Sequence, residues 1–186
     1  MTNKLKLLVA TSSLAVAVLG SAPAFAAGTA AGSTITNTAT VNYQVGGVAQ
    51  TAINASNSFT VDRKVNLTVA EVGNATTSVA PGSTAQVLTF TVTNTSNATL
   101  DLLLTATQAT GGTAAHGGTD NFDATTPTIY VDTNGNGTYD AGTDTAVTYL
   151  DEIAAAASRT VFIVSNIPIA RVNGDVAQLH LQAQAA

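Results

Sequence analysis

Several residue types that carry chemistry are rare or missing in this chain of 186 residues. It contains no cysteine, no tryptophan and only two histidines. The absence of cysteine excludes disulfides, thiolate metal sites and catalysis by a thiol. His116 lies in a Gly-rich loop and His180 on the polar face of a predicted strand, and neither belongs to a triad or zinc pattern, so we expect both to be solvated. The sequence therefore predicts a protein that is not an enzyme.

The N-terminus has the three parts of a secretory signal peptide in their usual order. Lys4 and Lys6 precede an apolar run over 7–19, and Ala24-Phe25-Ala26 has the small-x-small pattern of a cleavage site. The run is too short to span a bilayer comfortably. We expect residues 1–26 to form a cleaved signal helix and residues 27–186 to be the mature domain, secreted or held at the cell surface without a membrane span.

Positive charge is scarce after the signal peptide. The six Lys and Arg residues lose Lys4 and Lys6 on cleavage, whereas all eleven acids lie beyond residue 26, so the net charge becomes 4 − 11 = −7. A basic footprint for nucleic acid is absent, as is a polybasic patch for membranes. An acidic surface favours repulsion between copies and attraction of cations.

Polar and apolar residues alternate with period two in many short segments that are separated by Gly, Asn and Pro turns. In 85–95, Leu88, Phe90 and Val92 alternate with threonines, and in 99–107 the leucines at 100, 102 and 104 do the same. This pattern predicts an all-β protein, an antiparallel β-sandwich of one domain over 27–186, with room for an internal boundary near 108–127. Only 151–157 is compatible with a helix, and we expect a turn or a single helical turn there.

The mature N-terminal region is rich in polar β-formers. Residues 33–45 read as a strand, Gly46-Gly47 as a turn that tolerates positive φ, and a second strand resumes at Val48. A break or a sheet edge is expected near Arg63. The region 33–61 is expected either to pair with its own sheet or to add to the open edge of a neighbouring copy.

Residues 65–104 resemble a known family of bacterial and archaeal surface repeats, the domain of unknown function eleven. The resemblance rests on the Pro-Gly turn in 79–83, the Thr-rich strand 88–94 and the Ser-Asn-Ala-Thr-Leu hairpin at 96–100, with an upstream Asn-Thr-Ala strand at 35–41. It implies an immunoglobulin-like sandwich with a structural or adhesive role on a cell exterior. It implies no catalytic activity.

One loop has the spacing of a calcium site. From Asp132, oxygen-bearing side chains follow at loop positions 3, 5 and 9, Gly137 stands at the turn position, and a backbone carbonyl is expected at position 7. The loop resembles those of dockerins and calcium-bearing adhesin repeats, but position 12 is Thr143 and the next acid comes one residue later. The expected structural Ca²⁺ ligands are Asp132, Asn134, Asn136, Thr138, Asp140 and Asp144; the alternative is a solvated Asn-Gly hairpin without metal.

A further pair of carboxylates, Asp120 and Asp123, flanks Asn121-Phe122 in a polar loop. The pair is compatible with a second weak cation site or with paired catalytic carboxylates, but an exposed loop is favoured because aromatics to line a cleft are few.

Two functions follow from these observations. The favoured one is an exported surface protein with a structural or adhesive role, stabilised by calcium and assembling with itself or with other surface components through added strands. The alternative is a soluble extracellular module that binds a glycan or a protein partner, for which Tyr43, Tyr130, Tyr139 and Tyr149 are the candidate contacts.

Overall fold

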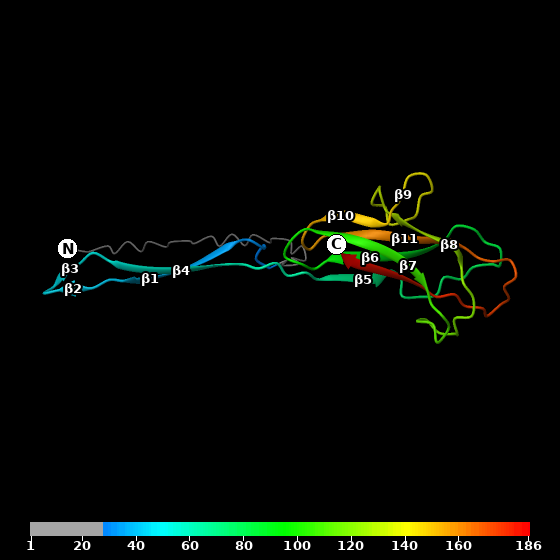
Figure 1. Cartoon of the computed structure of the whole chain (residues 1–186), viewed down its shortest axis with the longest axis horizontal. Coiled ribbons are helices and arrows are strands. Elements are labelled where there is room, and N and C mark those ends of the chain that lie inside the picture. The colour runs from blue at the N-terminus through cyan, green and yellow to red at the C-terminus, as the bar shows by residue number, and fades with distance from the viewer. Residues whose placement is uncertain (1–27) are drawn as a thin grey trace, which may run out of the picture.

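The computed structural model describes residues 28–186, and the predicted signal peptide, 1–26, lies outside them. The described part is all-β and contains no helix, hence none that could cross a membrane. It consists of an antiparallel β-sandwich and a long β-hairpin that projects from one end of the sandwich (Figure 1). We call this hairpin, residues 34–60, the arm. The predicted fold class is confirmed.

Two antiparallel sheets form the sandwich. Its strands are β5 (Leu67–Glu71), β6 (Gln86–Asn94), β7 (Leu100–Gln108), β8 (Thr125–Val131), β9 (Thr145–Ala146), β10 (Tyr149–Ile153), β11 (Ser158–Asn166) and β12 (Leu179–Ala185). One sheet has the order β5-β6-β11-β8-β9 and the other the order β10-β7-β12. Strand β5 therefore lies at an edge of the larger sheet, and β10 and β12 at the two edges of the smaller one.

The alternating residues fill the space between the sheets, as the pattern predicted. On β7 the leucines at 100, 102 and 104 are buried, whereas Asp101, Leu103 and Thr105 are exposed. Phe90 and Val92 face them from β6, and Val161 and Ile163 from β11. This burial of apolar side chains from both sheets is the main stabilising contribution. The segment 109–124, for which the sequence suggested an internal domain boundary, connects β7 to β8 of the sandwich.

The expected helical turn at 151–157 is wrong for its first half. Residues 151–153 belong to β10, because Leu150 and Ile153 are both buried against the core. They can both point inward only because the register with β7 shifts between them, and Glu152 takes a positive φ of 45° at this irregularity. The turn itself is confined to the alanines that follow.

Among the residues that the structure describes, the arm pairs only with itself. Strand β1 (Thr34–Val41) pairs along its whole length with β4 (Ile53–Thr60), and short strands β2 (Gln44–Val45) and β3 (Val48–Ala49) continue the hairpin to its tip. Gly46 and Gly47 have φ of 58° and 81°, as a two-residue turn between twisted strands requires. The predicted hairpin and the break near Arg63 are thus present, but neither strand joins a sheet of its own sandwich.

The side chain of Asn97, in the β6–β7 turn, fixes the base of the arm. Its amide nitrogen donates to the carbonyls of Thr29 (3.1 Å) and Asp62 (3.0 Å), and its oxygen accepts the N–H of Lys64 (2.9 Å). The Asn97 carbonyl also accepts the N–H of Ala31. The two chain segments that enter and leave the arm are therefore both held by one residue of the sandwich.

Its neighbours Asn94 and Ser96 form a buried polar network under the same turn. The Asn94 amide nitrogen donates to the carbonyls of Ala98 (2.9 Å) and Ile153 (2.7 Å), and its oxygen accepts the Ser96 N–H. The Ser96 hydroxyl both accepts from and donates to the backbone of Asn66 at 2.8 Å. This network connects the end of β6 to β10 and to the start of β5, so the polar residues of the motif have structural roles.

Candidate functional site

The arm has two faces of opposite character. In the β1–β4 register, Ile35 lies opposite Phe59, Ala39 opposite Ala55 and Val41 opposite Ile53, so these pairs share one face together with Asn37 and Asn57. The other face carries only threonines and serines with one asparagine, at the even-numbered positions 34–40 and 54–60. We call these the apolar face and the hydroxyl face of the arm. This strict alternation is typical of a ribbon with one face buried.

The apolar face is nevertheless exposed to solvent. Val41, Ile53 and Phe59 retain 57%, 58% and 57% of their accessible surface, and Val45 and Val48 at the tip are equally open. An isolated two-stranded hairpin is only marginally stable in water, and burial of an apolar face is what normally stabilises such a ribbon. The arm therefore has the composition of an element that is covered by a partner.

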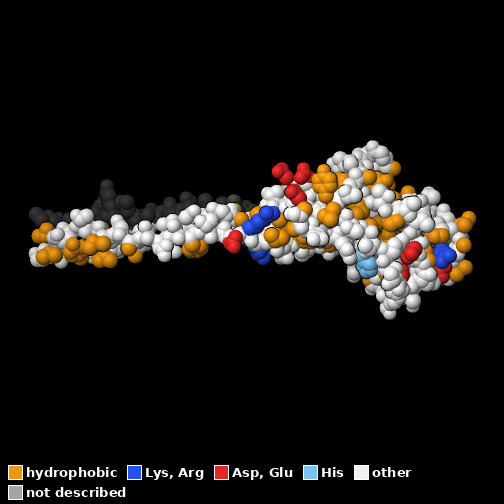
Figure 2. Space-filling view, viewed as in Figure 1, with side chains coloured by type: hydrophobic (Ala, Val, Ile, Leu, Met, Phe, Trp, Pro, Cys, Tyr) orange, Lys and Arg blue, Asp and Glu red, His pale blue; other side chains and the backbone are white. Residues whose placement is uncertain are grey.

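Charge is absent from the whole arm. No Asp, Glu, Lys or Arg occurs between residues 28 and 61, and the first charged residues are Asp62, Arg63 and Lys64 at its base. Figure 2 shows this as a projection without acidic or basic side chains, joined to a sandwich that carries them. Charged residues are the usual protection of exposed strands against pairing with other chains, and the arm lacks that protection.

The loop between β8 and β9 brings the predicted calcium ligands into one turn. Asp132 accepts the backbone N–H groups of Gly135 (2.7 Å) and Gly137 (2.8 Å). Asp140 Oδ2 accepts the side-chain amides of Asn134 (2.9 Å) and Asn136 (2.6 Å). The loop is thus closed by its own hydrogen bonds around the oxygens that were predicted to hold Ca²⁺.

Asp144 has a different position from the other predicted ligands. It is buried, and its two oxygens accept the N–H groups of Thr133 (3.0 Å) and Asp140 (2.7 Å), so it ties the two ends of the loop together. The N–H of Thr138 donates to Asn136 Oδ1. Among residues 28–186 no three His, Cys, Asp or Glu side chains are grouped closely enough to hold a metal ion. Calcium at this loop would rely on Asp132, Asp140 and amide oxygens.

The amides of Asn134 and Asn136 lower the pKa of Asp140 below its ordinary value, Asn134 having the larger effect. Because the folded pKa is depressed, this group stabilises the fold above the ordinary Asp pKa of about 3.9, and the contribution is lost as pH falls through the folded value. We expect Asp140→Asn to flatten the loss of stability over this acidic range. Urea unfolding midpoints of both proteins below about pH 5 measure this, and identical pH profiles would contradict it.

The same loop covers the outer face of the larger sheet. Phe162 on β11 is fully buried although it points away from the core between the sheets. Its cover is Tyr139, whose ring lies edge-on to Phe162 at 6.0 Å and to Tyr130 at 4.9 Å between centroids. Burial, and next the neighbouring Tyr130 hydroxyl, raise the pKa of Tyr139. Of the four tyrosines proposed as ligand contacts, Tyr130 and Tyr139 are thus packed together and only Tyr43 and Tyr149 are exposed.

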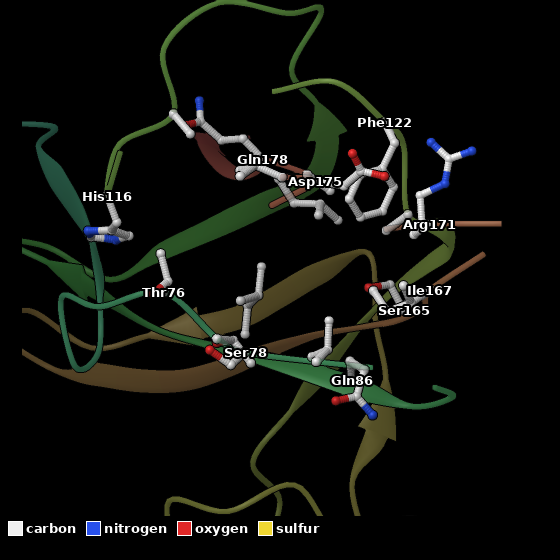
Figure 3. Close-up of a pocket in the computed structure, with 18 of the residues that line it drawn as sticks. Thr76, Ser78, Gln86, His116, Phe122, Ser165, Ile167, Arg171, Asp175 and Gln178 are labelled. Atoms are coloured by element: carbon white, nitrogen blue, oxygen red, sulfur yellow. The ribbon is translucent and has the colours of Figure 1, made fainter. Parts of the chain in front are cut away.

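A cavity of about 480 Å³ lies between the two sheets at the end of the sandwich remote from the arm. Its walls are mainly apolar and include Leu88, Phe90 and Leu179. Figure 3 shows His116 at one end of it and Phe122 with Arg171 at the other. The Arg171 guanidinium lies 5.3 Å from the centre of the Phe122 ring. The pattern of the sequence did not predict this cavity, because loops distant in sequence form most of it.

One further expectation is wrong in the structure. Asp120 is not an exposed loop residue: it is buried, and its oxygens accept the N–H groups of Gly111 and Gln178 at 2.8 Å. His116 is exposed, in line with the expectation, and its Nε2 lies 2.6 Å from Glu71 Oε2, a contact that connects the β7–β8 loop to β5. Both residues hold loops in place.

Comparison of the chain with family models, curated proteins and solved structures gives no match. The structure itself defines the chain as an antiparallel β-sandwich with a projecting, uncharged hairpin.

Proposed function

We propose that this chain is an exported, non-enzymatic structural or adhesive protein of the cell exterior, and that it associates with copies of itself through its arm. The observation that carries the proposal is the arm itself, an uncharged ribbon whose apolar face is exposed and has no cover among residues 28–186. The signal-like segment 1–26 and the resemblance of 65–104 to surface repeats support the location. The two-sheet sandwich agrees with the immunoglobulin-like architecture that the resemblance implies.

The location and the assembly have separate tests. Fractionation of cells that produce a tagged copy should recover the protein outside the cytoplasmic membrane, shortened by about the length of a signal peptide. Sedimentation of the purified protein over a wide concentration range, with electron microscopy, should show assemblies. A cytoplasmic, unprocessed chain or a monomer at all concentrations would contradict the proposal.

Calcium is proposed as a stabiliser of the loop 132–144. At about ten times its dissociation constant, Ca²⁺ should add about 1.4 kcal/mol to the free energy of unfolding, because it binds only the folded loop. Isothermal calorimetry at millimolar Ca²⁺ and melting with and without chelator measure this. Asp132→Asn combined with Asp140→Asn should abolish the effect, whereas Asp123→Asn, in an exposed position outside the loop, should preserve it. No heat and no chelator-dependent shift would contradict the proposal.

The second candidate is a soluble binding module for a glycan or protein partner, and the cavity between the sheets favours it. Such a ligand would contact Phe122 and Arg171, so binding detected on a glycan or peptide array that is lost in Phe122→Ser would favour this candidate over self-association.

A further inference from the structure

The hydrogen bonds of the strands show which surfaces could cover the apolar face of the arm. In the β1–β4 ladder, Val61 N–H donates to the Ser33 carbonyl at 2.8 Å, so odd-numbered residues bond across the hairpin. The N–H and C=O groups of even-numbered residues then point outward at both edges of the arm. These are the residues of the hydroxyl face.

At the open edge of β12, the residues whose N–H and C=O groups point outward are those whose side chains face the core. Ala109 N–H donates to the Gln178 carbonyl and Ala186 N–H to the Asp101 carbonyl, in the register of β12 with β7. Even-numbered residues therefore bond to β7, and the outward groups belong to odd-numbered residues such as Leu181, whose side chain faces the core. An arm added antiparallel to this edge would turn its hydroxyl face toward the interior side and leave its apolar face in water.

The open edge of β5 gives the same result. Val72 N–H donates to the Thr89 carbonyl and Thr95 N–H to the Asn66 carbonyl, so even-numbered residues bond to β6. The outward groups belong to residues such as Val69, which packs against the core. Antiparallel addition to either of these two edges therefore fails to bury the apolar face, although that face is what the sequence alternation specifies. The other edge of the smaller sheet, β10, has only five residues and a register shift between Leu150 and Ile153, so it is too short to pair with the whole of β1 or β4.

An opposing apolar surface of similar length occurs at one place in the described chain, the arm itself. Outside the arm, the exposed large hydrophobic residues are scattered over the sandwich in small groups: Val65, Val72, Leu103, Tyr149, Ile169 and Val172. Charge points to the same partner. The arm is neutral, whereas residues 62–186 carry a net charge of 4 − 11 = −7, so two copies repel each other least where arm meets arm.

We propose that the arms of two copies pack with their apolar faces together and with their tips pointing in opposite directions. This inference rests on the proposed self-association and names its contact surface. The opposite direction places the two acidic sandwiches at the far ends of the paired arms. The 13 residues from Thr34 to the tip at Gly46 span roughly 43 Å. The two sandwiches are therefore separated by much more than the distance of about 8 Å over which physiological salt screens their charges.

The size of the contact sets its strength. A face about 43 Å long and about 10 Å wide offers on the order of 400 Å² per arm, half of the roughly 800 Å² that a stable interface of standard size buries per partner. The association is therefore weak and dependent on concentration. A two-fold axis through the middle of the arms brings Ala39 and Ala55 of the two copies close together.

The experiment compares neighbouring residues on opposite faces in the full mature chain. Sedimentation velocity over a concentration series should show that Val41→Asp raises the dimer dissociation constant about tenfold or more, since a charge on the apolar face would be buried. Thr40→Asp, which adds the same charge one residue away on the hydroxyl face, should change it little. Equal effects of the two substitutions would overturn the inference.

A second measurement does not depend on a disruptive charge. Because the chain has no cysteine, Ala39→Cys introduces a single thiol on the apolar face and should form disulfide-linked dimers on mild oxidation, whereas Thr38→Cys should form few. If copies associate but Ala55→Cys on the arm cross-links instead to Gln182→Cys on β12, the arm–arm contact is overturned while self-association stands. A protein that stays monomeric at every concentration overturns both.

Discussion

Replacing Asn94 with alanine should lower the free energy of unfolding by about 3 kcal/mol or more. The side chain is fully buried and makes three hydrogen bonds, two to the carbonyls of Ala98 and Ile153 and one from the Ser96 N–H. Alanine leaves these backbone groups without a partner in a region that water does not reach, and each such group costs about 1–3 kcal/mol. Urea unfolding followed by circular dichroism measures the loss.

The control is the neighbouring asparagine of the same turn. Asn97 is half-buried and its partners belong to the base of the arm, so Asn97→Ala should destabilise the sandwich by about 1 kcal/mol or less. A loss for Asn94→Ala no larger than that for Asn97→Ala would show that the buried network contributes little to the fold.

Replacing Tyr139 with alanine should cost about 2–3 kcal/mol, the second largest effect we expect. The Tyr139 ring covers Phe162, and its removal exposes an aromatic side chain that is otherwise fully buried. Complete truncation of a buried aromatic ring costs about 3–5 kcal/mol, and Tyr139 is itself only half-buried. Thermal and urea unfolding measure the change.

Two variants separate the contribution of the ring from other effects. Tyr139→Phe keeps the ring and should retain most of the stability, whereas Tyr43→Ala removes an exposed ring near the tip of the arm and should have almost no effect. If Tyr139→Ala is as stable as Tyr43→Ala, the loop does not stabilise the outer face of the sheet.

The sandwich strands were predictable because each has an alternation whose apolar side meets another such side. Leu102 on β7 and Val92 on β6 are buried as their positions in the pattern require. The same pattern also misleads, since Ile35, Ala39 and Val41 alternate with threonines in the same way. Alternation specifies which side chains share a face, but it does not say whether the chain itself covers that face. The projection of the arm therefore could not be predicted.

The loop residues were predictable as a group but not in their individual roles. The spacing from Asp132 to Asp140 does place these side chains around one turn. Asp144, one residue beyond position 12 of the loop, was predicted as a further ligand, yet it is buried and bonded to the backbone at both oxygens. The role of Tyr139 depends on Phe162, which is distant in the sequence, so no local pattern indicates it. Whether Ca²⁺ occupies the loop stays a prediction.

The attachment of the arm has a consequence for how such a protein can change. Asn97 hydrogen-bonds to the base of the arm through main-chain atoms of Thr29, Ala31, Asp62 and Lys64. The direction in which the hairpin leaves the sandwich is therefore encoded by the sandwich, independently of the hairpin's side chains. A different ribbon could be grafted between residues 33 and 61 and keep its orientation, so the choice of partner can evolve, or be engineered, without redesign of the fold that presents it.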